Sequence, residues 1–180
     1  SWTKFASMPE PGNSNLIFGQ IAVSANDKDN IIWLPVGNRM PYYTTDRGNT
    51  WTQVTLPNNS GNCCLTAQWF QRKALTADRV LPNTFYIYDW GDGSIFKSSD
   101  GGQSWVPTQF AHELQREIAI MDMAMSPTNP KLMLAATNEG LFRTDDGWQT
   151  SSQIRSGEHN SVKFNPIDDL QVITGHRMYE

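Results

Sequence analysis

The chain has 180 residues, a formal net charge of −4 and 18% charged residues. This length suits about one domain with a real core, and the interspersed acids and bases argue against a nucleic-acid-binding surface, which is normally basic. No run of about 18 apolar residues occurs, so no membrane-spanning helix is predicted. Seven Trp, 13 Gly and 10 Pro favour short strands joined by tight turns.

Short apolar strands are predicted in groups of four that repeat along the chain. Residues 1–5 read like the fourth strand of such a group, and a fourth group breaks off where the chain reaches Glu180. The predicted strands are 17–25, 31–36, 40–45 and 51–56, then 74–80, 84–88, 94–99 and 105–108, then 118–125, 132–137, 141–144 and 152–155, then 161–164 and 170–174.

A turn motif, Ser/Thr-x-Asp-x-Gly-x-Ser/Thr-Trp, follows the third strand of each complete group. It is intact at 44–51 and 98–105 but degraded at 144–151, where the glycine falls one place early and Ser151 replaces tryptophan. An aspartate at this position can accept backbone amides two residues on, and glycine accepts φ > 0. The predicted structural residues are Asp46, Gly48, Trp51, Asp100, Gly102, Trp105 and Asp146.

The motif resembles the Asp-box of β-propellers, and its aspartates are 54 and 46 residues apart, near the period of propeller blades. Prolines in the turns between first and second strands repeat independently, at Pro82, Pro127 and Pro166. The predicted fold class is therefore all-β, with about three and a half to four four-stranded antiparallel blades. We place these blades at 17–56, 74–108, 118–155 and, incomplete, 159–180.

The ends of the chain fall at matching points of the repeat. Residues 1–5 would supply the outer strand either of a preceding blade or of the fourth blade in a small closed ring. We favour an excerpt of a larger propeller, because ring closure would cut through a turn motif that lacks its aspartate and glycine. The remaining blades would then come from the same longer chain or from a partner chain.

The two cysteines, Cys63 and Cys64, are adjacent in a polar loop. They are free or partly buried thiols, a vicinal disulfide, or partners of a cysteine outside this chain. No further cysteine or histidine lies at ligand spacing, so we predict neither a metal site nor a cofactor.

Ligand-binding residues are expected on the face opposite the motif turns, where the second-to-third and blade-to-blade loops lie. Flat aromatic rings beside carboxylates and amides suit sugar binding, although inter-blade packing is the alternative for each tryptophan. Asp89, Asp92, Glu113, Glu117 and Glu139 are on this face, but nothing selects a catalytic pair among them; Asp78 and Asp122 are either buried and hydrogen-bonded or line the channel. The candidate substrate-binding residues are Trp33, Trp90, Trp69, Arg39 and Asp89.

Two stretches resemble the second propeller of glycoside hydrolase family 74, the xyloglucanases. They are 19–24 (Gly-Gln-Ile-Ala-Val-Ser) leading to 32–35 and 43–46, and 77–88, with its Ala-Asp-Arg-Val-Leu-Pro-Asn-Thr-Phe-Tyr run. The resemblance implies two tandem seven-bladed propellers and inverting hydrolysis of β-1,4-glucan backbones by one aspartate from each propeller. Neither aspartate maps onto this chain, so the catalytic residues are unknown and the chain would supply binding surface, with Trp33 as a sugar contact.

Two other interpretations stay open. The first is a non-catalytic Asp-box propeller that acts as a glycan-binding or protein-assembly module. The second is a sialidase, which needs an arginine cluster that the sequence does not show. The preferred interpretation implies a secreted protein, extracellular or periplasmic, with a polysaccharide or oligosaccharide as its partner and with no nucleic-acid or membrane partner.

Overall fold

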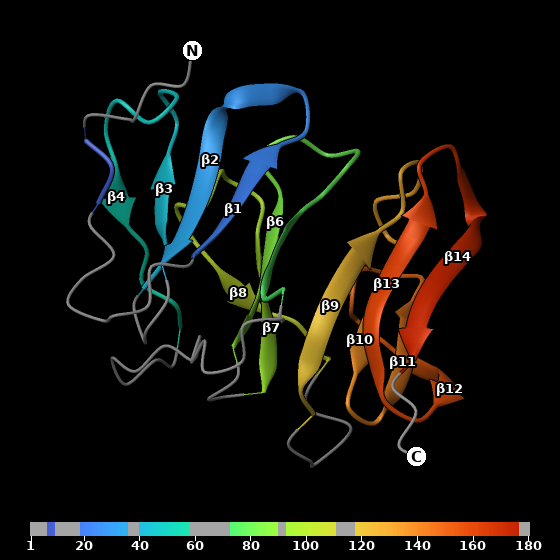
Figure 1. Cartoon of the computed structure of the whole chain (residues 1–180). Helices are drawn as coiled ribbons and strands as arrows, with labels where there is room; N and C mark the ends of the chain where they lie inside the picture. The colour runs from blue at the N-terminus through green and yellow to red at the C-terminus, as the bar shows by residue number, and fades with distance from the viewer. Residues whose placement is uncertain are drawn as a thin grey trace.

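The structure is a computed structural model that describes residues 7–9, 19–35, 40–57, 73–89, 93–110 and 118–176. Within these residues, 14 strands form four antiparallel sheets that lie side by side in chain order (Figure 1). No helix in the described ranges is long and apolar enough to cross a membrane.

Three of the sheets have four strands each and the fourth has two, and every strand pairs with its neighbour in the sequence. The strands are β1 (Gly19–Ser24), β2 (Asp27–Pro35), β3 (Tyr42–Thr44) and β4 (Thr52–Gln53) in the first sheet, β5 (Leu75–Ala77), β6 (Phe85–Asp89), β7 (Ser94–Ser98) and β8 (Val106–Pro107) in the second, β9 (Ile120–Met125), β10 (Met133–Thr137), β11 (Gly140–Thr144) and β12 (Ser152–Ser156) in the third, and β13 (His159–Asn165) and β14 (Asp168–His176) in the fourth.

This arrangement confirms the predicted all-β propeller fold, with three four-stranded blades and a two-stranded fourth sheet. The outer strands β4 and β8 are shorter than predicted, at two residues each. Beyond each of them one further amide still donates to the third strand's side of the sheet, that of Val54 to the Pro41 carbonyl at 2.7 Å and that of Thr108 to the Ile95 carbonyl at 2.8 Å. The strand predicted at residues 1–5 lies outside the described residues.

The sheets pack face to face, as the third sheet shows. Alternate residues of a strand point to opposite faces, so one sheet can contact two neighbours. One face of the third sheet (Met123, Met125, Met133, Ala135, Phe142) lies in a shared core with the first two sheets, and the other (Ala124, Leu132, Leu134, Ala136, Leu141) packs on Val162 and Phe164 of the fourth.

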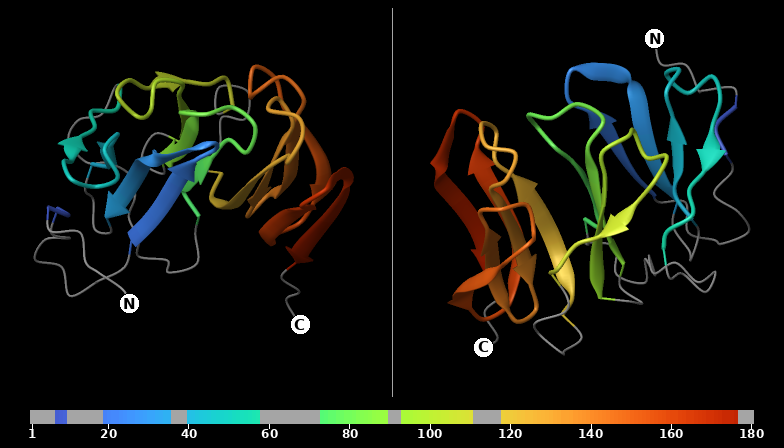
Figure 2. Two further views of the ribbon diagram at one scale, coloured as in Figure 1. Left: turned by 90° about the horizontal axis from the view of Figure 1, so that it is seen from above. Right: turned by 180° about the vertical axis from the view of Figure 1, so that it is seen from behind.

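The ends of the strands define two faces of the molecule. The β1–β2 and β3–β4 hairpin turns and their equivalents lie at one end of the sheets, which we call the turn face. The β2–β3, β6–β7 and β10–β11 connections leave the other end, the loop face. Consecutive sheets contact through their first strands, β1 with β5, β5 with β9 and β9 with β13, and Figure 2 shows the same sequential order from two further directions.

Candidate functional site

The first aspartate turn, residues 44–50, is closed by hydrogen bonds to the carboxylate of Asp46. Its Oδ1 accepts the Thr44 hydroxyl at 2.7 Å and the Thr50 amide at 2.9 Å, and its Oδ2 accepts the Thr50 hydroxyl at 2.6 Å. Thr44 Oγ1 in turn accepts the amide of Gly48 at 2.9 Å. The carboxylate is therefore committed to holding the hairpin.

The second and third aspartate turns, 98–104 and 144–150, repeat these bonds. Asp100 accepts from Ser98 and Ser104, and Asp146 accepts from Thr144 and Thr150, at 2.5–2.9 Å. The third turn, degraded in sequence, is thus complete in structure. The reason is that two successive residues after each aspartate have positive φ, so glycine at either position relieves the strain: Arg47 and Gly48 (59° and 83°), Gly101 and Gly102 (79° and 95°), and Gly147 and Trp148 (77° and 67°).

The tryptophans of the turns differ in burial. Trp105 is 4% exposed, and its indole N–H donates to the Gly102 carbonyl at 2.9 Å. Trp51 is half-buried. In the third turn, which lacks the closing tryptophan, Trp148 is 1% exposed and packs edge-to-face on Phe110, with ring centroids 4.9 Å apart. A different position of the motif therefore supplies the buried ring.

The hydrogen bonds of the turns also change the acidity of their carboxyls. The hydroxyl and amide of Thr50 lower the pKa of Asp46 to about 2, and those of Thr150 do the same for Asp146. Burial acts to raise the pKa of Asp100, but the bonds from Ser104 and Ser98 outweigh it and leave the pKa below its ordinary value. Each folded-state pKa is depressed, so this stabilisation is present above about pH 4 and is lost as the pH falls toward 2.

We expect Thr50→Val to raise the pKa of Asp46 from about 2 toward its ordinary 3.8, because the hydroxyl of Thr50 is its largest stabilising contact. Titration of the carboxyl carbons by NMR measures this change. Thr150→Val is the matched control, which should shift Asp146 and leave Asp46 alone. An unchanged Asp46 titration in Thr50→Val would contradict the assigned cause.

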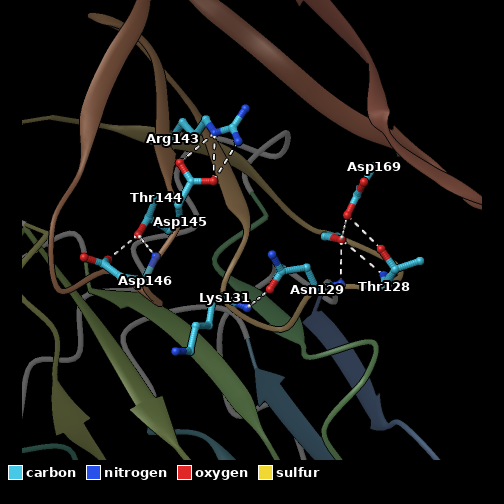
Figure 3. Close-up of polar contacts among 9 residues, drawn as sticks. Thr128, Asn129, Lys131, Arg143, Thr144, Asp145, Asp146 and Asp169 are labelled. Atoms are coloured by element: carbon cyan, nitrogen blue, oxygen red, sulfur yellow. Dashed lines mark hydrogen bonds and ion pairs between the residues drawn. The ribbon is translucent and has the colours of Figure 1, made fainter.

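Side chains of the turn face also join neighbouring sheets. Asn30 of β2, 1% exposed, donates to the carbonyls of Thr44 at 3.0 Å and Gly101 at 2.8 Å, which ties the first sheet to the second aspartate turn. Asp169 of β14 accepts from Ser126 at 3.1 Å and from Thr128 at 2.7 Å, both in the turn that joins β9 to β10 (Figure 3). On the turn face these side chains therefore serve contacts between neighbouring sheets.

Two of the predicted ligand-binding residues, Trp33 and Asp89, are among the described residues. Asp89 ends β6 and is 3% exposed, so its side chain is shielded from solvent within this chain. Trp33 of β2 is half-buried, and its ring lies against Gly19, where an added Cβ would be 2.1 Å from the ring. Arg39, Trp69 and Trp90 lie outside the described residues, as do Asp92, Glu113, Glu117 and the two cysteines.

The inner-strand aspartates are buried and hydrogen-bonded, which was one of the two predicted alternatives. Asp78, 1% exposed, accepts the amides of Val80 at 2.8 Å and Leu81 at 2.9 Å and so caps its own turn. Asp122, 4% exposed, accepts the Val162 amide at 3.2 Å and the Lys163 ammonium, which links β9 to β13. Within the described ranges, no three His, Cys, Asp or Glu side chains gather to hold a metal ion.

The sequence did not reveal a histidine pair at the loop end of the fourth sheet. His159 begins β13, is 1% exposed, and meets His176 of β14 with ring centroids 5.2 Å apart. Burial lowers the pKa of His159, and the neighbouring charges of His176 and Arg155 lower it further. The two histidines meet because they pair across β13 and β14, and this pairing is visible only once the strand register is known.

We expect the protein to lose stability as the pH falls below about 6.5, because unfolded chains then take up a proton that the buried His159 resists. His159→Leu should remove this part of the pH dependence, because leucine does not titrate. An apolar side chain fits this position, since the corresponding first residue of β9 is the buried Ile120. Thermal unfolding of both proteins between pH 5 and 8 provides the measurement. Identical pH profiles would show that His159 is not responsible.

The fold and the repeated aspartate turns define the class of this protein as a β-propeller. No protein-family model matches the chain. A curated relative, the oligoxyloglucan-reducing end-specific xyloglucanase of Emericella nidulans, is 36% identical over 121 residues, which are 58% of this chain and 13% of the relative. The chain therefore spans a small part of that relative's length.

Solved structures of the same enzyme family also resemble this chain. A family 74 glycoside hydrolase from Niastella koreensis aligns with 80% of this chain and 19% of its own, with a TM-score of 0.60 and 23% identity. The family 74 xyloglucanase from Xanthomonas campestris aligns with 97% and 30%, with a TM-score of 0.56 and 18% identity. Together with the curated relative, these structures confirm the predicted resemblance to glycoside hydrolase family 74.

A propeller of another kind shares the fold. The structure of YCF48 bound to D1 peptide aligns with 85% of this chain and 47% of its own, with a TM-score of 0.52 and 17% identity. At these identities the structural likeness establishes the fold alone.

Proposed function

We propose that this chain is part of a secreted, extracellular or periplasmic hydrolase of xyloglucan or a related β-1,4-glucan, and that it contributes substrate-binding surface. The observation that carries the proposal is the 36% identity over 121 residues to a protein named as a xyloglucanase. The propeller fold shared with family 74 structures supports it.

The division of the molecule into two faces suggests where substrate would lie. The turn face is occupied by the aspartate turns and by contacts between sheets, such as those of Asn30 and Asp169. This leaves the loop face for a ligand, with Arg39, Trp69 and Trp90 as proposed contacts. The aspartate turns themselves, which we interpret as Asp-boxes, act as scaffold.

The catalytic acids are proposed to lie outside residues 1–180. Inverting hydrolysis needs a general acid and a general base on opposite sides of the bond, far enough apart to admit water. Asp78 and Asp122 are buried and engaged by amides or an ammonium group, which makes them unsuitable for either role. Two aspartates elsewhere in the complete polypeptide would supply the chemistry, while this chain binds and orients the glycan.

The test uses the complete natural polypeptide, whose intact mass is measured first, together with the 180-residue chain. We expect the complete polypeptide to release reducing ends from xyloglucan but not from a β-1,3-glucan, with inverted anomeric configuration in the first product by NMR. The 180-residue chain should bind xyloglucan oligosaccharide in calorimetry without cleaving it. A complete polypeptide that neither binds nor cleaves xyloglucan would overturn the proposal.

That negative result would favour the second candidate, a non-catalytic propeller that binds glycans or assembles proteins. The fold likeness to the structure of YCF48 bound to D1 peptide is the observation on its side. Absence of a carboxylate pair from the flanking sequence would point the same way.

A further inference from the structure

The fourth sheet brings two histidines together at its loop end, where the chain passes from β12 to β13. His159 pairs with His176 across β13 and β14, and their ring centroids are 5.2 Å apart. His176 lies two residues beyond Thr174, which pairs with the buried Val162, so it is on the side of the fourth sheet that packs on the third. The histidine pair therefore lies at the junction of these two sheets.

Two features of the backbone make this pairing possible. The register places one extra residue between His159 and Ser161. Such a bulge re-aims a side chain, a device common beside functional sites, and here His159 shares the buried side with Val162, three residues on. In the turn before β13, Gly157 has a φ of 89°, and a Cβ there would lie 2.8 Å from Nε2 of His176. The glycine thus leaves room for the second imidazole.

The inner histidine, His159, is buried without good hydrogen bonds. Among the described residues, neither of its ring nitrogens has a partner of good geometry, although the Ser156 backbone lies nearby. A neutral imidazole carries one N–H donor and one acceptor, and leaving both unpaired in the interior costs free energy. A buried polar group of this kind in a native protein indicates a water or an ion beside it.

The distance between the two rings suits a shared metal ion. Two imidazoles that bind one zinc ion at about 2.0–2.1 Å, with a tetrahedral angle between them, have ring centroids about 5 Å apart. The 5.2 Å separation and the 82° between the ring planes fit this arrangement, because each ring can rotate about its bond to the metal. Edge-to-face packing gives a similar distance, but it leaves the nitrogens of His159 unpaired. His176 is exposed, so an ion can reach the pair from solvent.

We propose that His159 and His176 together bind one divalent transition-metal ion, such as Zn²⁺, Cu²⁺ or Ni²⁺, with the remaining coordination positions open to water. Imidazole nitrogen suits these ions, whereas Mg²⁺ and Ca²⁺ prefer oxygen ligands. Sequence spacing predicted no metal site, since the strand register alone brings the two histidines together. The ion would fasten the end of β14 to the start of β13. The inference does not depend on the proposed hydrolase function.

The neighbouring Arg155 allows a test of the site by charge. Its positive charge acts on His159 and has the same sign as a bound cation, so it opposes metal binding. Because Arg155 is exposed, it can be replaced without disturbing the core. We expect Arg155→Gln to tighten metal binding about three- to fivefold, whereas Arg155→Lys, which keeps the charge, should bind like the parent.

The measurement is a calorimetric titration of the complete polypeptide with Cu²⁺, Ni²⁺ or Zn²⁺ alone. The protein carries no polyhistidine tag, and Cys63 and Cys64 are replaced by serine. We expect a site of micromolar affinity, tightest for Cu²⁺, that is lost in His176→Gln. His112→Gln removes the remaining histidine of the 180 residues and, as the matched control, should keep the site. Zn²⁺ should raise the melting temperature of the parent but not that of His176→Gln.

Equal Cu²⁺ binding by the parent and His176→Gln would overturn the proposal, as would loss of the site in His112→Gln. His159→Leu should also lose the site. Should that variant fail to fold by circular dichroism, Arg155→Gln still reports on the inner histidine. Weaker binding in Arg155→Gln than in the parent would contradict the proposal, because the ion would then not lie beside His159.

Discussion

Trp148→Ala should lower the free energy of unfolding by about 3–5 kcal/mol, the range for removing a large buried aromatic side chain. Trp148 is 1% exposed and packs edge-to-face on Phe110, and its carbonyl accepts the Gln109 amide at 2.9 Å. For a chain of this size the loss corresponds to a fall in melting temperature of roughly 6–20 °C. Urea and thermal unfolding measure both quantities.

Two further variants separate packing from backbone strain at this position. Trp148 has a φ of 67°, so Trp148→Gly removes the same ring but relieves the left-handed backbone. We expect the glycine variant to be about 1 kcal/mol more stable than the alanine variant. Trp51→Ala, which truncates a half-buried tryptophan of the first turn, should cost less than either. A loss below about 1 kcal/mol in Trp148→Ala would contradict the packing role.

The second large effect is expected at Gly102, where Gly102→Ala should cost about 2–4 kcal/mol from left-handed strain and overpacking combined. Gly102 has a φ of 95°, and an added Cβ would lie 2.3 Å from Ile32 Cδ1 and 3.0 Å from Tyr43 Cβ. Ile32 is fully buried, so it cannot simply swing away. Urea unfolding of the variant and the parent protein gives the difference.

Gly147 offers a matched control in the third turn. Its φ is 77°, close to that of Gly102, but an added Cβ would meet nothing within 4 Å. Gly147→Ala should therefore cost only the strain, about 1–2 kcal/mol. Adding Ile32→Val, which removes the clashing methyl group, should recover part of the loss in Gly102→Ala but not in Gly147→Ala. Equal losses in the two alanine variants would show that the contact with the first sheet is unimportant.

The fold could be predicted from the sequence because its strongest signals are local. The pattern around Asp46 and Asp100 places every hydrogen-bonding group of a turn within seven residues, so the motif and the structure coincide. For the same reason the sequence pattern makes the third turn look degraded, although its hydrogen bonds are complete. The motif requires glycine at the second of two adjacent left-handed positions. It does not anticipate a turn in which Gly147 takes the first position and Trp148 the second.

The candidate site was harder to predict from the sequence, because it depends on burial and on strand register. The sequence predicted Asp89 as a candidate substrate-binding residue, and its side chain is buried at the end of β6. The sequence around an aromatic residue such as Trp33 does not distinguish stacking on a sugar from packing between sheets. Only the pairing of Ile21, Trp33 and Tyr42 across three strands shows which side of the sheet it occupies. Histidines 159 and 176, 17 positions apart, meet for the same reason.

Packing between sheets, in the described part of the chain, joins neighbours in the sequence: first to second, second to third and third to fourth. A chain organised in this way behaves as a one-dimensional array, in which each unit depends on the units beside it. The fourth sheet, with two strands and one small cluster on the third, should then be the first to open, and its amides should exchange with deuterium fastest. The second sheet, held through Phe85, Ile87 and Phe96 on one side and through Tyr86, Tyr88 and Ile95 on the other, should exchange last.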